Sequence, residues 1–158
     1  MITYFGVRAA LLDRFGQPAA ELIRTQEEWV INTGGSVDAI SPYRYMSRVF
    51  LDGILVPAIE RCDEPTIRAC CNFLETALTG GDRDLWECIS IRVTDRILGD
   101  RGWTSAVLAL AGPRWTRELR RWRRGHPLAV LDVGPARRWG ITPGTGIGSR
   151  LVTHEPAV

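Results

Sequence analysis

Apolar residues recur every three or four positions along this chain, from residue 5 to residue 124. That period places apolar side chains on one face of an α-helix, whereas a half-buried strand needs alternation at every second residue. The fullest stripe lies within residues 63–79 and consists of Ile67, Cys70, Cys71, Leu74, Ala77 and Leu78. We therefore expect an all-α fold, a bundle or short array of about six or seven helices.

Capping and breaking residues place the ends of these helices. The predicted N-caps, whose side-chain oxygens can accept hydrogen bonds from free backbone N–H groups, are Ser41, Asp63, Asp82 and Thr104. The predicted breaks are Gly16, Gly80 with Gly81, and Gly99, and Pro57 should end or kink its helix. The resulting helices are 5–15, 18–30, 42–55, 63–79, 82–98, 105–111 and 114–124. The short turn at Gly81 predicts an antiparallel pair.

The sequence changes character after Gly125. Nine of the 24 residues from Gly125 to Gly148 are glycine or proline, so we expect a helical domain over 1–125 and an irregular, partly disordered segment over 126–158. Leu128–Val133 is predicted to be a short strand or extended segment. Gly144–Gly148 is similar to a phosphate-binding loop, but it lacks the P-loop lysine and no helix pattern follows it, so we interpret it as flexible tail.

The apolar runs and the N-terminal residues of the sequence indicate where the protein is located, and the location in turn indicates the state of its cysteines. Its longest apolar runs, such as Val107–Ala111, are too short to span a bilayer, and no basic stretch followed by an apolar one opens it. We therefore expect a cytoplasmic protein without disulfides. The four cysteines are predicted to be small buried apolar residues: Cys62, Cys70, Cys71 and Cys88.

Charge is distributed unevenly along the chain, which has no lysine. Residues 1–100 contain 10 arginines and 15 acidic residues, whereas residues 101–158 contain 10 arginines and 3 acidic residues. The absence of lysine is explained either by GC-rich codon usage or by selection, for example to escape lysine-directed modification.

A cluster of arginines is interleaved with tryptophan in residues 114–124. The candidate partner-binding residues are Arg114, Arg117, Arg120, Arg121 and Arg124, with Trp86. They would form either a solvated face above core anchors (Trp115, Leu119 and Trp122), a surface for an acidic protein or for this chain's own acidic half, or a nucleic-acid surface. The formal net charge of only +2 argues against a dedicated nucleic-acid binder.

No catalytic, cofactor-binding or metal-binding motif is recognisable. His126 and His154 have no cysteine or carboxylate at ligand spacing, and no Gly-x-Ser-x-Gly elbow occurs. Glu27 and Glu28 are adjacent and should diverge by about 100° on a helix, so they cannot form an acid–base pair. We therefore predict no catalytic residues, no cofactor, no metal and no enzyme activity.

The central stretch resembles a bacterial family of uncharacterised, small, all-helical, immunity-protein-like chains of a kind found beside polymorphic toxin genes. The resemblance covers about half the chain and is carried by Tyr45–Ala58 (YMSRVFLDGILVPA), Cys71–Leu78 (CNFLETAL), Gly81-Asp82, Leu85–Leu98 (LWECISIRVTDRIL) and Leu110–Leu119 (LAGPRWTREL). It implies an all-α fold without enzyme activity and provides no binding residues.

The leading hypothesis is a protein-binding role, in which an immunity-type or adaptor protein neutralises or sequesters a protein partner such as a toxin. The first alternative is a nucleic-acid-binding regulator that uses residues 114–124. The second is an enzyme whose site is assembled from scattered residues. The sequence does not predict an oligomeric state.

Overall fold

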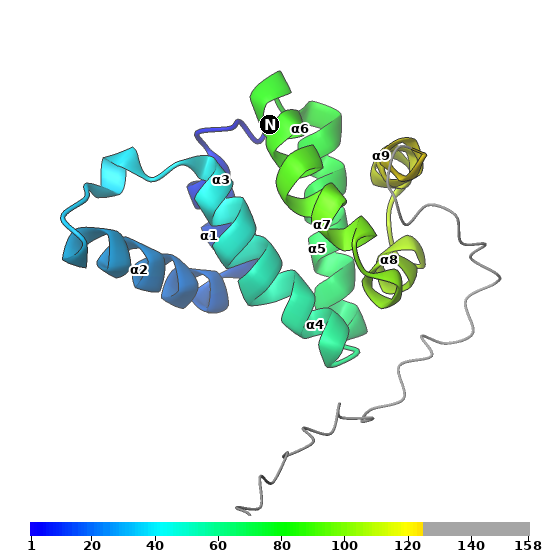
Figure 1. The fold of residues 1–158 in the computed structure, drawn as a ribbon, viewed down its shortest axis with the longest axis horizontal. Helices are drawn as coiled ribbons and strands as arrows, with labels where there is room; N and C mark the ends of the chain where they lie inside the picture. The colour runs from blue at the N-terminus through cyan, green and yellow to red at the C-terminus, as the bar shows by residue number, and fades with distance from the viewer. Residues whose placement is uncertain (125–158) are drawn as a thin grey trace, which may run out of the picture.

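The computed structural model describes residues 1–124, within which it contains helices and no strand (Figure 1). The α-helices are α1 (Val7–Phe15), α2 (Gln17–Asn32), α3 (Pro42–Arg44), α4 (Val56–Glu60), α5 (Glu64–Gly80), α6 (Arg83–Ile89), α7 (Asp95–Leu98), α8 (Arg101–Leu108) and α9 (Pro113–Arg123). The element η1 (Val37–Ala39) is a 3-10 turn, and η2 (Tyr45–Leu55) and η3 (Ser90–Thr94) are π-helical.

Two groups of these elements are continuous. The segments α3, η2 and α4 form a central rod (residues 42–60), and α6, η3 and α7 form a return rod (residues 83–98). The part of the chain up to residue 124 thus contains seven helical rods, which confirms the predicted all-α fold. None of these helices is both long and apolar enough to cross a membrane.

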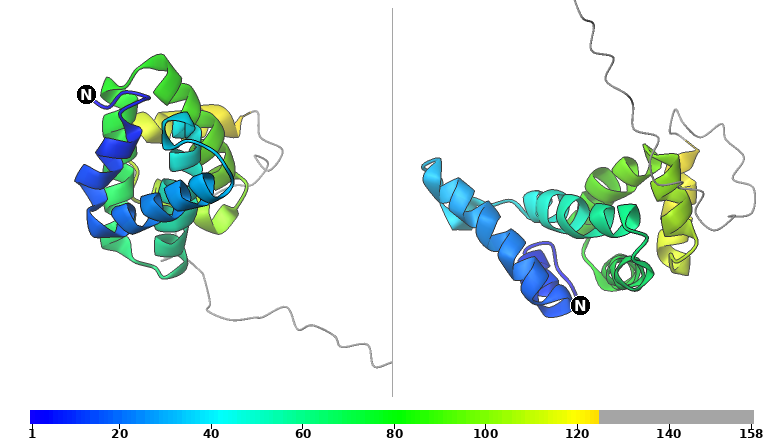
Figure 2. Two further views of the ribbon diagram at one scale, coloured as in Figure 1. Left: turned by 90° about the vertical axis from the view of Figure 1, so that its left-hand side faces the viewer. Right: turned by 90° about the horizontal axis from the view of Figure 1, so that it is seen from below.

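The central rod lies in the middle of the molecule. It contacts α1 and α2 on one side and α5 and η3 on the other (Figures 1 and 2). The return rod runs back beside α5, which confirms the predicted antiparallel pair, and α9 packs on α5 beyond it. The far end of α2 projects from the rest of the molecule (Figure 2).

Three of the four predicted N-caps are confirmed. Ser41 accepts the Tyr43 N–H, Asp63 accepts the Thr66 N–H and Asp82 accepts the Leu85 N–H. The prediction for Thr104 is wrong. Asp100 caps α8 instead, at 2.9 Å from the Trp103 nitrogen, and its carboxylate starts the helix four residues earlier than expected. The Thr104 hydroxyl is buried and donates to backbone oxygens.

Of the two alternatives expected at Pro57, an end of the helix is wrong, because the central rod continues to Glu60. A proline inside an α-helix lacks a donor and clashes with the carbonyl four residues earlier. Here Pro57 directly follows a widened section in which the Val56 N–H donates to the Leu51 oxygen, five residues back. This change of hydrogen-bond register accommodates the proline without ending the helix.

The widened section also keeps one face of the central rod inside the core. Adjacent residues are buried in pairs, at positions 45 and 46, 49 and 50, 54 and 55, and 58 and 59. The first and last pairs are 13 residues apart, which would be about 3.6 turns of an α-helix and would put them on different sides. Wider turns cover the same 13 residues in fewer rotations, so all four pairs face inward.

Three phenylalanines from three helices meet against this face. The ring of Phe50 lies 6.0 Å from that of Phe15 of α1 and 5.2 Å from that of Phe73 of α5, and the latter two rings are 5.7 Å apart. Phe50 is fully buried. Such a contact among α1, the central rod and α5 stabilises the arrangement of elements far apart in sequence.

The prediction that Cys62 is buried is wrong, and Trp29 is exposed as well. Trp29 is 53% exposed on the projecting end of α2, where the Arg44 guanidinium lies 4.1 Å from its ring. Cys62 lies two residues after the last residue of α4, is exposed and adopts a φ of 55°. The Asp63 N–H then bonds to the Ala58 oxygen and the Cys62 N–H to the Ile59 oxygen, the pattern in which glycine usually takes this position.

The other predicted core residues behave as expected or nearly so. Cys70, Cys71 and Cys88 are buried, as is Trp115, whereas three tryptophans are half-buried: Trp86, Trp103 and Trp122. Several predictions lie outside the described residues: the boundary after residue 125, Leu128–Val133, Gly144–Gly148 and both histidines.

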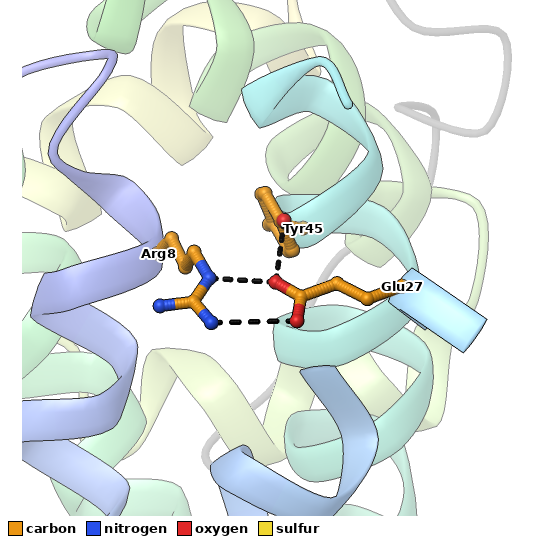
Figure 3. Close-up of polar contacts among 3 residues, drawn as sticks. All are labelled: Arg8, Glu27 and Tyr45. Atoms are coloured by element: carbon orange, nitrogen blue, oxygen red, sulfur yellow. Dashed lines mark hydrogen bonds and ion pairs between the residues drawn. The ribbon is translucent and has the colours of Figure 1, made fainter. Parts of the chain in front are cut away.

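A polar cluster ties α1, α2 and the central rod together at their exposed edge (Figure 3). Arg8 donates to Glu27 through Nε at 2.6 Å and Nη2 at 3.4 Å, and the Tyr45 hydroxyl donates to the same carboxylate at 3.1 Å. The Arg8 hydrogen bond is the main cause that holds the pKa of Glu27 below its ordinary value. Burial, together with the bond to Glu27, raises the pKa of Tyr45.

We predict that Phe50→Ala lowers the free energy of unfolding by about 3–5 kcal/mol, because it leaves a cavity among three helices. Urea unfolding followed by circular dichroism measures this. The control is Ile91→Ala, which truncates a side chain that is 42% exposed and should change stability little. Equal effects of the two substitutions would contradict the assigned core.

We predict that Glu27→Gln destabilises the protein at neutral pH and that this difference disappears in acid. A carboxylate whose folded-state pKa is lowered contributes stability above its unfolded pKa and loses it as pH falls through the folded pKa. The gap between wild type and variant should therefore close from about pH 5 downward. A gap that stays constant in urea titrations between neutral and acid pH would show that the charge of Glu27 is not involved.

Candidate binding surface

The arginine-rich segment forms α9, which is anchored by its inner face. Trp115 is fully buried and Leu119 is 1% exposed, and both belong to the core that α5 and the return rod share. The Trp115 ring nitrogen donates to the Thr94 hydroxyl of η3 at 3.4 Å. The predicted stripe of Trp115, Leu119 and Trp122 is confirmed, although Trp122 is only half-buried. The helix is therefore anchored on the core by its inner face, and its outer face is left exposed.

Glu75 of α5 fixes the start of this helix. Its carboxylate accepts the backbone N–H groups of Arg114 at 2.8 Å and Trp115 at 3.0 Å. The carboxylate lies so close to Gly112 that a Cβ at that position would come within 2.5 Å of the Glu75 Cδ. Because α9 has no acidic residue in its first turn, Glu75 supplies from another helix the negative charge that a helix N-terminus favours.

All five arginines predicted as partner-binding residues are exposed: Arg114, Arg117, Arg120, Arg121 and Arg124. Among residues 1–124, none of them forms an ion pair with a carboxylate. By contrast, four arginines elsewhere have such partners, as in the pairs Arg24–Glu28 and Arg68–Glu64. The basic surface of α9 is therefore not neutralised within the described part of the molecule.

Trp86 of α6 lies at the edge of this surface. Its ring packs on the core and is half-buried, and the Arg121 guanidinium lies 5.5 Å from its centroid. The structure thus brings together two of the predicted residues that are 35 positions apart in sequence. We refer to Trp86 with the five exposed arginines as the α9 surface.

Helix electrostatics explain part of this arginine pattern. Arg120 and Arg121 lie in the last turn of α9, where positive charge interacts favourably with the helix dipole. Arg114 lies in the first turn, where the same interaction is unfavourable. Helix stability therefore does not account for the arginine at this position.

The one acidic residue of α9 points away from this surface. Glu118 is 5% exposed, and within residues 1–124 its Oε2 has no hydrogen-bond partner. The buried Ser90 hydroxyl of η3 is likewise without one in this part of the chain. Sequence reasoning did not identify the burial of Glu118. Its spacing offered a signal, because Glu118 lies three residues after Trp115 and next to Leu119.

The other candidate groups do not assemble a reactive centre in the described residues. Glu27 bonds to Arg8 and Glu28 to Arg24, so the two carboxylates diverge as expected. Burial raises the pKa of Cys71 and of Cys88 to about 12 and also raises that of Cys70, which keeps these thiols protonated and poorly nucleophilic. No cluster of three or more potential metal ligands occurs up to residue 124.

Comparisons add no further information on function. No protein-family model matches the chain, and neither a curated protein nor a solved structure matches it significantly. The resemblance to immunity-like proteins therefore stays a prediction.

We predict that Glu75→Ala weakens the docking of α9 and lowers the free energy of unfolding by about 1–2 kcal/mol, since two N-terminal N–H groups lose their acceptor. Urea unfolding measures the loss. Thr76→Ala, a substitution at the next and exposed position of the same helix, is the control. If both variants were equally stable, Glu75 would not hold α9 in place.

Proposed function

We propose that the chain is a protein-binding module whose α9 surface binds an acidic patch on a partner, as an immunity-type or adaptor protein would to neutralise or sequester it. The observation that carries this proposal is a helix anchored on the core that presents five exposed arginines beside a half-buried tryptophan. Within residues 1–124 these arginines have no carboxylate partner.

Interface energetics support this use of the α9 surface. Arginine and tryptophan are the residues most enriched among those that dominate binding energy, because they offer large contact areas together with hydrogen-bond donors. The buried anchors Trp115 and Leu119 hold the helix before a partner arrives, so little ordering would be required on binding. The unneutralised positive charge would accelerate association with an acidic surface.

We predict that the triple charge reversal Arg117→Glu, Arg120→Glu and Arg121→Glu abolishes capture of an acidic partner from the native host. The measurement is affinity capture at physiological salt with identification by mass spectrometry. The matched control reverses three exposed arginines outside α9, namely Arg14, Arg61 and Arg101. Circular dichroism of each variant verifies that the helices are intact.

The proposal requires that affinity capture yields a protein with the wild type and with the control variant, and that the same protein is absent from the capture with the α9 variant. If all three chains retained the same protein, the α9 surface would not be the interface. A gel shift with duplex and single-stranded DNA tests the nucleic-acid alternative, which predicts binding that weakens steeply with salt. Such binding without any captured acidic protein would replace the proposal.

A further inference from the structure

A groove of about 740 Å³ is lined by residues of the central rod and the return rod. These two rods are in contact, and α9 lies on the other side of the return rod (Figure 1). Its floor includes the buried Leu51, and its rim includes the exposed Ile91 and the hydroxyl-bearing Ser47. The α9 surface does not contribute to it. The two π-helical sections, η2 and η3, form part of its walls.

Four arginines line this groove as two pairs on opposite walls. Arg44 and Arg48 come from the central rod, and Arg92 and Arg96 come from the return rod. Each pair is spaced four residues apart, which places its members on the same side of a helix. The groove therefore has positive charge on both walls.

Aspartates offset only part of this charge. Asp52 and Asp95 also line the groove, and Asp52 pairs with Arg48 at 3.1 Å. Within residues 1–124, Arg44, Arg92 and Arg96 form no ion pair with a carboxylate. The lining thus keeps a net positive charge of two, the difference between four arginines and two aspartates.

Two of the guanidinium groups are held by aromatic rings. Arg44 reaches to α2, where its guanidinium lies 4.1 Å from the Trp29 ring and its Nε donates to Gln26 at 3.2 Å. Arg92 lies 5.2 Å from the ring of Tyr43, which also lines the groove. Stacking occupies the face of a guanidinium and leaves N–H donors at its edge, where phosphate oxygens can bind in pairs. It also limits the rotamers of a long side chain, so less entropy is lost when a ligand binds.

We propose that this groove binds a small molecule carrying two or more phosphate groups. Its volume falls in the range of small-molecule sites, about 300–1,000 Å³. Arg48 on one wall and Arg92 with Arg96 on the other can contact separate phosphates, and Leu51 with Ile91 can contact an apolar part of the ligand. This site is independent of the α9 surface, because the return rod separates the two (Figure 1).

The test is isothermal titration calorimetry with inorganic pyrophosphate as the probe. We expect saturable binding of one pyrophosphate per chain, weakened by about tenfold or more in Arg92→Gln/Arg96→Gln, since each substitution removes a charge-assisted donor. The matched control, Arg61→Gln/Arg68→Gln, removes the same charge from arginines outside the groove and should bind like wild type. The α9 triple variant should also bind normally, so failure here and failure of the protein-binding proposal are distinguishable.

Sulfate and a glutamate-rich peptide are titrated in parallel. Selectivity for pyrophosphate over sulfate, lost in the Arg92→Gln/Arg96→Gln variant, supports the site. The proposal is overturned if no saturable binding occurs, if sulfate binds equally well, or if the groove variant binds like wild type. Tighter, Arg92-dependent binding of the acidic peptide would overturn it in favour of a peptide groove.

Discussion

The central rod must keep an apolar face turned inward along all of residues 42–60, and the positions of the neighbouring helices depend on this. Four buried pairs, from Tyr45 and Met46 to Ala58 and Ile59, contact helices on both sides. Regular α-helical geometry would rotate the last pairs away from the first, so the widened section η2 is what makes one continuous core. Phe50 then joins α1 and α5 through this core.

Much of the fold could be predicted from the sequence, because local signals and burial agree. Asp63 and Asp82 cap the helices that their positions predicted, and the stripe from Ile67 to Leu78 is buried throughout. The π-helical sections were not predicted, because apolar residues four positions apart fit the turn of an α-helix as well as the wider turn of a π-helix. Buried pairs that recur at four and five positions, rather than three and four, would have indicated the widened turns before Pro57.

The candidate site was predicted only in part. A local count of charge identified the arginines of α9, and the structure places Arg121 on Trp86. The residue that positions this helix, Glu75, lies about 40 positions earlier and carries no local signal of its role. The groove arginines were not predicted either, because Arg44 and Arg92 line the same groove only once two rods that are distant in sequence pack together. Such sites depend on tertiary contacts, which residue spacing does not encode.

Native-state hydrogen exchange measured by NMR tests the role of the central rod most directly. If neighbouring helices depend on it, the amides from Met46 to Leu55 should exchange only through global unfolding, as slowly as those of α5. The projecting end of α2 near Trp29 should exchange faster, because it has few buried contacts. Rapid exchange of η2 through local opening, while α5 stayed protected, would contradict this account.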